Sequence, residues 1–246
     1  MMNIRLILQF DGTRYYGWQK QKKHVTVQSV VEKALSKLLD QDIDLIGCSR
    51  TDAGVHALCY NANFHAKTNI PPDKISFAVN PLLPEDIVVV ESCLVSDDFH
   101  ARYDAKSKTY KYLVHASPKR NPLLNNRVWH VNRALDLNLM QKAAVHIQGK
   151  REYDAFRAQG GYAKTTTRTI FHTIVKQEYL PNIYSIEVCG DGFLYNMVRI
   201  IAGTLVYVGL GKISPDNLSM IIESKDRTKA GITAPPHGLY LYDVSY

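Results

Sequence analysis

The chain has 246 residues, of which 46% are hydrophobic and 22% are charged. This composition excludes a disordered or collagen-like chain, and the length suffices for a core that needs neither disulfides nor a structural metal. The formal net charge of +7 favours an anionic partner, most often nucleic acid, although many basic proteins bind none.

No segment is typical of a membrane span or of a secretory signal. The longest strongly apolar stretch, residues 197–210, is interrupted by Arg199 and two glycines, and it falls short of the roughly 20 apolar residues of a span. The N-terminus has no charged segment followed by an apolar run. The four cysteines include no Cys-x-x-Cys pair and are typical of reduced thiols. We therefore expect a cytoplasmic protein without a membrane anchor or a metal site.

The first half of the chain predicts strands mixed with helices. Apolar residues alternate over residues 4–10, which predicts a strand, and a lysine-rich loop follows over residues 11–26. Apolar residues at helical spacing over 27–38 predict a helix, with Thr26 placed to cap it. Further elements are a helix after Pro71-Pro72 and strands at 43–47, 58–64 and 87–95.

The second half repeats this mixture. The predicted elements are strands at 110–114, 128–131 and 239–244, a hairpin over 170–188 that turns at Pro181-Asn182, and helices at 137–147, 194–208 and 215–223. Together they predict an α+β fold with a mixed, largely antiparallel sheet flanked by helices. No linker separates the two halves. We therefore place an approximate boundary between residues 1–105 and 106–246 and expect the sheet to continue from one half into the other.

The polar loop Arg50-Thr51-Asp52-Ala53-Gly54-Val55-His56 lies between two predicted strands. Asp and Gly are typical turn residues, because Asp accepts hydrogen bonds from nearby N–H groups and Gly adopts a positive φ. The same loop also presents a lone carboxylate on a scaffold, beside an arginine, as a nucleophile or base requires. Taken alone, the loop favours the turn interpretation.

Further sequence segments along the whole chain match, in the same order, those of a known protein family that also contains this loop. The chain resembles the tRNA pseudouridine synthase A family, whose central motif Gly-Arg-Thr-Asp-Ala-Gly-Val-His is matched from position 49 onward with Ser49 in place of Gly. The other matching segments are Tyr15–Gln19, Phe99–Arg102, Lys108–Tyr112, Gly192–Arg199 and Pro236–Leu241. Ser49 would be strained if its position demanded a positive φ.

The resemblance implies isomerisation of a uridine within RNA: the N1–C1′ bond breaks, the uracil rotates, and C5 bonds to C1′. Such a reaction needs no cofactor, metal or energy source. The family fold has two ferredoxin-like halves around a central cleft that holds the active site. The expected substrate is uridine 38, 39 or 40 in the anticodon stem-loop of tRNA, and the expected assembly is a homodimer. Two alternatives stay open, namely the same chemistry on ribosomal RNA and a non-catalytic RNA-binding or chaperone protein.

The resemblance also implies roles for single residues. Asp52, in the N-terminal half, is the nucleophile, and Arg50 helps to hold the target nucleotide out of its stack. In the C-terminal half, Tyr110 stacks on the uracil, and Arg199 forms a salt bridge to Asp52. The competing interpretations are a phosphate contact for Arg50, a core aromatic for Tyr110 and a structural ion pair for Arg199. For Tyr112 the core interpretation is the better one.

Basic residues surround these motifs and suit contacts to an RNA backbone. The candidates for substrate binding are Lys22, Lys23, Lys111 and Arg168. The alternative for each of them is an ordinary solvated surface. The combination of Asp52, Tyr110 and Arg199 disfavours a protein that only binds RNA.

Overall fold

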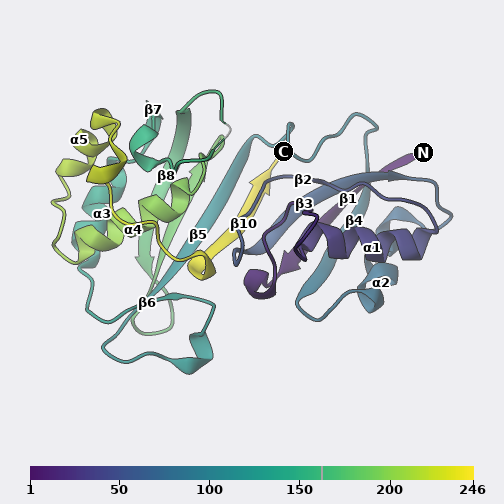
Figure 1. Cartoon of the computed structure of the whole chain (residues 1–246), viewed down its shortest axis with the longest axis horizontal. Helices are drawn as coiled ribbons and strands as arrows, with labels where there is room; N and C mark the ends of the chain where they lie inside the picture. The colour runs from purple at the N-terminus through teal and green to yellow at the C-terminus, as the bar shows by residue number, and fades with distance from the viewer. Residues whose placement is uncertain (162) are drawn as a thin grey trace. The chain divides into compact units, whose positions relative to one another are not determined.

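The computed structural model describes residues 1–161 and 163–246, which form two compact units (Figure 1). The first unit comprises residues 1–106 and 240–246, and the second comprises residues 107–239. Each unit combines a largely antiparallel sheet with helices, so the chain has the predicted mixed α+β fold. Among the described residues, no helix is long and apolar enough to cross a membrane.

The sheet of the first unit contains β1 (Met2–Phe10), β2 (Ile46–Gly47), β3 (His56–Ala66), β4 (Ile87–Val95) and β10 (Leu239–Ser245). β1 is antiparallel to β3 and β4, β2 is antiparallel to β3, and β10 is parallel to β3. The helices α1 (Val27–Leu39) and α2 (Ile75–Val79) contact each other. The chain order β1-α1-β2-β3-α2-β4 with strand order β4-β1-β3-β2 is a ferredoxin-like arrangement.

The core of this unit follows from the alternation in β1 and the apolar stripe of α1. The side chains of Ile4, Leu6 and Leu8 are completely buried in β1, as are Val31 and Leu35 on α1. Burying an apolar side chain of this size contributes about 1.5 to 3 kcal/mol, so these positions fix which face of each element points inward.

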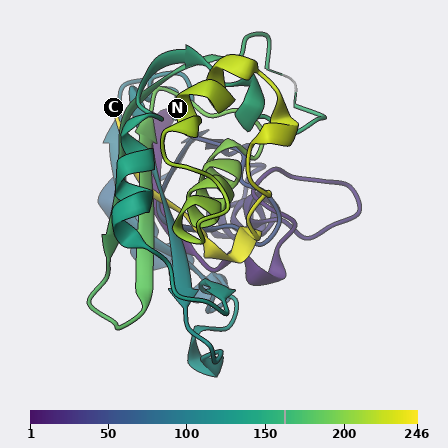
Figure 2. The same cartoon turned by 90° about the vertical axis from the view of Figure 1, so that its left-hand side faces the viewer.

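The second unit has β5 (Ser107–Ala116), β9 (Ile183–Gly190), β8 (Thr167–Gln177) and β7 (Gly149–Glu152) as antiparallel neighbours in that order, and β6 (Trp129–Val131) pairs in parallel with β5. Its helices are α3 (Leu137–Val145), α4 (Met197–Gly209) and α5 (Asn217–Ser224). α3 packs against β8 and α4, and α4 also contacts β5, so these two helices lie side by side on the sheet (Figure 2). α4 is the most apolar of them and is buried along almost its whole length.

Short 3-10 helices connect these elements at Gly12–Arg14, Pro72–Lys74, Asn80–Leu82, Pro122–Leu124, Asp154–Phe156, Arg227–Lys229 and Pro236–Gly238. The predicted strand at 43–47 is shorter than expected, because Ile43 and Leu45 give their N–H groups to Ser36 Oγ and Glu32 Oε1 on α1 instead of to a strand. β7 is a strand that the sequence does not predict, since Gly149–Glu152 is polar throughout and has no alternation.

The predicted cap of α1 is confirmed. Thr26 Oγ1 accepts the N–H of Ser29 at 3.3 Å, and Ser29 Oγ accepts the N–H of Thr26 at 3.2 Å. This reciprocal pair satisfies donors that the first turn of a helix otherwise leaves unpaired. It also fixes the point where the lysine-rich loop ends and the helix begins.

We expect Thr26→Val to lower the free energy of unfolding by about 1 kcal/mol, because valine keeps the shape of threonine but cannot accept the Ser29 N–H. Thr26→Ser keeps the oxygen and measures the cost of the buried methyl group alone, about 0.8 kcal/mol. Urea denaturation of the three proteins measures the difference. Because the lost methyl group of the serine variant is itself buried, the test is the comparison with the unaltered protein: equal stability of Thr26→Val and the unaltered protein would contradict a contribution from the cap.

Candidate active site

The loop that carries Asp52 connects β2 to β3. Thr51 is buried, Asp52 is half-buried and Arg50 is exposed. The N–H of Val55 donates to the carbonyl of Asp52 at 3.2 Å, and Gly54 has a φ of +78°, which a glycine adopts without strain. The loop is therefore a tight turn, and this turn presents the carboxylate on a fixed backbone.

The segment Tyr15–Gln19 holds this turn from both sides. The N–H of Trp18 donates to the carbonyl of Thr51, and the N–H of Gly54 donates to the carbonyl of Tyr15, each at 3.2 Å. Between these two bonds, Gly17 has a φ of +78°, and a Cβ at this position would lie 2.2 Å from the Thr51 carbonyl oxygen. Only glycine permits so close an approach, so two of the matching sequence segments form one structural unit around Asp52.

A carboxylate anchors the first residue of this segment. Tyr15 Oη donates to Asp86 Oδ1 at 2.5 Å, and Arg14 contacts Oδ2 of the same carboxylate through Nε and Nη2, both at 2.6 Å. Burial and the hydrogen bond to Asp86 raise the pKa of Tyr15 above its ordinary value, so the phenol stays a donor. The carbonyl that receives the Gly54 N–H is thereby fixed in place.

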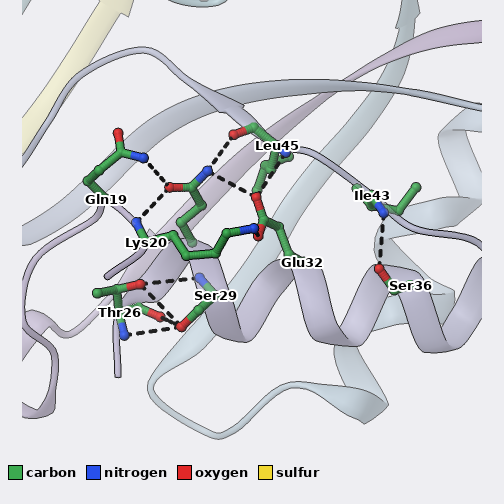
Figure 3. A network of polar contacts seen from close by, with 9 residues as sticks. Gln19, Lys20, Thr26, Ser29, Glu32, Ser36, Ile43 and Leu45 are labelled. Atoms are coloured by element: carbon green, nitrogen blue, oxygen red, sulfur yellow. Dashed lines mark hydrogen bonds and ion pairs between the residues drawn. The ribbon is translucent and has the colours of Figure 1, made fainter. Parts of the chain in front are cut away.

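Helix α1 anchors the other end of the segment (Figure 3). The side-chain Oε1 of Gln28 accepts the backbone N–H of Lys20 at 2.8 Å, and the backbone N–H of Gln28 donates to the carbonyl of Trp18 at 3.1 Å. Glu32, whose side chain is only 7% exposed, binds Lys20 Nζ at 2.7 Å and accepts the N–H of Leu45 at 3.1 Å. A buried carboxylate of this kind is stable only with such partners.

Ser49 causes no backbone strain in this site. Its φ is not positive, so serine replaces the glycine of the family motif without the strain that a left-handed backbone would impose. Tyr60 Oη donates to the carbonyl of Ser49, and the ring of Tyr60 stacks on Trp18 at 3.9 Å between centroids. The start of the loop is thus packed against the same aromatic core as the Tyr15–Gln19 segment.

In the second unit, β5 carries Tyr110 and Tyr112. Tyr112 is completely buried, and its hydroxyl donates to the carbonyl of Pro235 at 2.7 Å, which confirms its interpretation as a core residue. Tyr110 is 6% exposed, and its ring meets that of Phe193 edge to face with centroids 5.2 Å apart. Phe193 belongs to the matching segment Gly192–Arg199, so this segment orients the Tyr110 ring.

Arg199 lies in the first turn of α4 and is half-buried. Its Nε donates to the carbonyl of Ala234 and its Nη1 donates to Asn196 Oδ1, both at 2.7 Å. Asn196 precedes the helix with a φ of +60°, a conformation that asparagine tolerates better than most residues. These bonds hold the guanidinium in one orientation within an otherwise apolar helix.

The predicted RNA contacts lie in different surroundings. Lys22 and Lys23 are exposed in the loop before α1. Lys111 is only 15% exposed and pairs with Glu178 at 2.7 Å, an interaction that lowers the pKa of the Glu178 carboxyl. Arg168 gives Nη1 to the carbonyl of Thr167 at 2.6 Å. The contacts of Lys111 and Arg168 within the protein are structural, and their binding of substrate stays a prediction.

Sequence reasoning missed the residues that support the site. Gln28 and Glu32 are one turn apart on α1 and look like ordinary solvent-facing positions, yet each residue is 5% exposed. Asp86 gives no sequence signal beyond a charge before a strand. In the described ranges, no group of three or more His, Cys, Asp or Glu side chains could hold a metal ion.

Comparison with known proteins finds relatives along the whole chain. Residues 6–104 and 143–246 match the family model described as tRNA pseudouridine synthase. A protein from Acetivibrio thermocellus named tRNA pseudouridine synthase A is 52% identical over 246 residues, and one of the same name from Thermoanaerobacter sp. strain X514 is 50% identical over 247 residues. Both alignments cover 100% of this chain and 100% of the relative.

Among solved structures, a crystal structure of a Cbf5-Nop10-Gar1 complex aligns with a TM-score of 0.40 and 11% identity, covering 97% of this chain and 48% of that one. The family match and the relatives, not this weaker likeness, identify the chain. It is an isomerase of the pseudouridine synthase class. The chain belongs to the tRNA pseudouridine synthase family, and its reaction is the isomerisation of uridine in tRNA.

The contact between Gly17 and the Asp52 loop gives a test. Gly17→Ala and Gly211→Ala both place a Cβ at a positive φ, which costs about 1 to 2 kcal/mol, but Gly211 has open space around it. We expect Gly17→Ala to lose about a further 1 to 3 kcal/mol of stability, because the Thr51 carbonyl must move. Urea denaturation measures both variants.

Amide hydrogen exchange locates the effect. In Gly17→Ala the amides of Trp18 and Gly54 should exchange faster, because the displaced Thr51 carbonyl is the acceptor of Trp18 and the displaced residues 51–53 directly precede Gly54. In Gly211→Ala both amides should keep the rates of the unaltered protein. Unchanged protection of both amides in Gly17→Ala would mean that the Asp52 loop does not depend on this contact.

Proposed function

We propose that the chain isomerises uridines 38, 39 and 40 of the tRNA anticodon stem-loop, with Asp52 as the nucleophile and without a cofactor. The observation that carries this proposal is the turn around Asp52, which two backbone hydrogen bonds from the Tyr15–Gln19 segment and the close contact of Gly17 hold in place. Such a fixed backbone is what a carboxylate needs to meet one atom of a bound nucleotide. The names of the full-length relatives support tRNA as the substrate.

The proposed reaction rearranges bonds within one nucleotide. The N1–C1′ bond breaks, the uracil turns while bound, and C5 forms the new bond to C1′. The proton on C5 then leaves, and N1 gains one, so the overall change is an isomerisation. Attack of the carboxylate at C1′, attack at C6 and elimination through a glycal all require Asp52 to be ionised.

The other roles follow from the residue chemistry. Arg50 is exposed beside Asp52, where a guanidinium can hold the target nucleotide out of its stack. Tyr110 supplies an aromatic ring for the uracil and a hydroxyl for the late proton transfer. Arg199, oriented by Asn196 and Ala234, supplies the positive charge that favours an ionised nucleophile. Lys22, Lys23, Lys111 and Arg168 bind the RNA backbone.

The proposal places the enzyme in the cytoplasm as a homodimer that acts on tRNA. The net charge of +7 suits a polyanionic substrate. The same chemistry on ribosomal RNA is the alternative that mapping would reveal: pseudouridines lost from ribosomal RNA, and not from tRNA, in cells lacking the protein would contradict the assignment of the substrate.

Asp52→Asn tests the nucleophile. Asparagine keeps the shape and the hydrogen bonds of the turn but cannot form the covalent bond, so we expect turnover to fall by about four orders of magnitude or more. Tritium release from an anticodon stem-loop RNA labelled at C5 of uridine measures the reaction. Asp98→Asn, at an exposed aspartate outside the loop, is the control and should keep normal turnover. Near-normal release by Asp52→Asn would refute the assignment.

Arg199 can be tested against a second half-buried arginine of the same unit, Arg227. Arg227 donates to the same segment 231–234 that Arg199 contacts through Ala234, from Nη1 to the Gly231 carbonyl at 2.8 Å and from Nη2 to Thr233 Oγ1 at 3.1 Å. Arg199→Met and Arg227→Met should therefore destabilise the protein to a similar extent. We expect only Arg199→Met to lose turnover, by about 100-fold, the effect typical of a missing electrostatic group in an active site.

Arg199→Lys should restore part of the single-turnover rate, since lysine keeps the charge but not the planar fork. Single-turnover tritium release at saturating enzyme measures all three variants. Equal losses in Arg199→Met and Arg227→Met would show that Arg199 acts only through the fold.

A further inference from the structure

The loop before α1 carries an exposed aromatic stack. The rings of Tyr16 and His24 lie 3.9 Å apart between centroids and are inclined by only 14°, so they are stacked face to face. Both residues are exposed, and 54% of Tyr16 is accessible. Two ordered aromatic rings at the surface leave an outer face on which a further flat ring can stack, as nucleobases do on aromatic side chains.

This stack is held rigidly. The N–H of Tyr16 donates to the carbonyl of Val25 at 3.0 Å and closes the loop, and Gln21 Nε2 donates to the carbonyl of Tyr16 at 3.1 Å. At the two ends of the loop, Lys20 is bound to Glu32 and Thr26 caps α1 (Figure 3). A platform that is ordered before binding loses little conformational entropy when a ligand arrives.

The stack also belongs to the segment that holds the proposed nucleophile. Tyr16 lies between Tyr15, whose carbonyl accepts the Gly54 N–H, and Gly17, which contacts the Thr51 carbonyl. Both neighbours of Tyr16 in sequence therefore touch the loop of Asp52. The backbone of Tyr16 is thus held by the same contacts that hold the Asp52 loop, which makes a nucleotide adjacent to the target uridine the natural candidate for the Tyr16 ring.

The charge of the loop suits the same ligand. Lys22 and Lys23 are exposed between Tyr16 and His24 in the closed loop. Two ammonium groups beside a stacking surface match a nucleotide, which has a phosphate on each side of a flat base.

We propose that the Tyr16–His24 stack is a binding platform for an unpaired nucleobase next to the target uridine, with Lys22 and Lys23 on the adjoining phosphates. The inference deepens the proposed function and rests on it for the position of the target uridine. The platform would hold a neighbour of the target and not the target itself, whose uracil is assigned to Tyr110. It would thus keep the strand in position while one nucleotide is displaced.

The salt dependence of RNA binding distinguishes a loss of base stacking from a loss of phosphate contacts. Stacking of one base corresponds to about 1 to 3 kcal/mol, so Tyr16→Ser should weaken binding of an anticodon stem-loop RNA about 5- to 150-fold at every salt concentration. The slope of log K against log salt should not change, because no phosphate contact is lost. Lys22→Met combined with Lys23→Met should instead flatten the slope. Tyr16→Phe should bind as the unaltered protein does.

Tyr179→Ser is the matched control, because Tyr179 is 99% exposed in the other unit and should be neutral. The RNA supplies the second half of the experiment: abasic sites are placed one position before or after the target uridine. At one of these two positions, the abasic site should weaken binding to the unaltered protein but not to Tyr16→Ser. That position identifies the base that stacks on Tyr16. Hydrogen exchange of the Trp18 and Gly54 amides in Tyr16→Ser shows whether the Asp52 loop is intact.

Unchanged affinity of Tyr16→Ser across the salt series would overturn the inference. It would also be overturned if each abasic site weakened binding to Tyr16→Ser as much as it weakens binding to the unaltered protein. Failure of the unaltered protein to release tritium from the anticodon stem-loop RNA is a different result. It would overturn the proposed substrate while the binding comparison of the Tyr16 variants still stands or falls by itself.

Discussion

The close packing of two backbone segments, Gly17 against the carbonyl of Thr51, is the constraint on which the candidate site depends. Hydrogen bonds alone would allow the turn around Asp52 to shift, since each contributes only about 1 kcal/mol net. A backbone that fits against another without an intervening side chain leaves no such freedom. The flanking bonds at Trp18 and Gly54 then fix the register of the two segments. The position of the carboxylate is thus a property of the main chain.

Helix α1 extends this constraint to the surface. Its buried Gln28 and Glu32 bind the chain on either side of the helix, at Lys20 and at Leu45, and a buried carboxylate must keep these partners or lose stability. The lysine-rich loop therefore begins and ends at fixed points although its own residues are exposed. A loop with such ends combines accessibility for a ligand with a small entropy of ordering.

The sequence predicts the parts of this fold that depend on local patterns. Alternation in β1 and β4, helical spacing in α1, the Thr26 cap and the hairpin turn at Asn182 are all confirmed, because each is decided by residues close together in the chain. β7 escapes prediction because its four residues are polar and only pairing with β8 makes them a strand. The bonds of Arg199 to Ala234 and of Tyr15 to Asp86 join residues 35 and 71 positions apart. Such contacts leave no periodic signal, and only the family motif indicates that Arg199 matters.

The pairing of β10 with β3 has a consequence for how the chain acquires its structure during synthesis. β10 is translated after the whole second unit and completes the sheet of the unit that is made first, and Tyr246 Oη and the carbonyl of Ser245 add bonds to Ala101 and Lys106. A nascent chain can form the whole second unit while the sheet that carries the Asp52 loop still lacks one strand. Contacts of such long sequence separation form slowly. The loop with the proposed nucleophile, translated early, is thus among the last regions to gain its full set of neighbours.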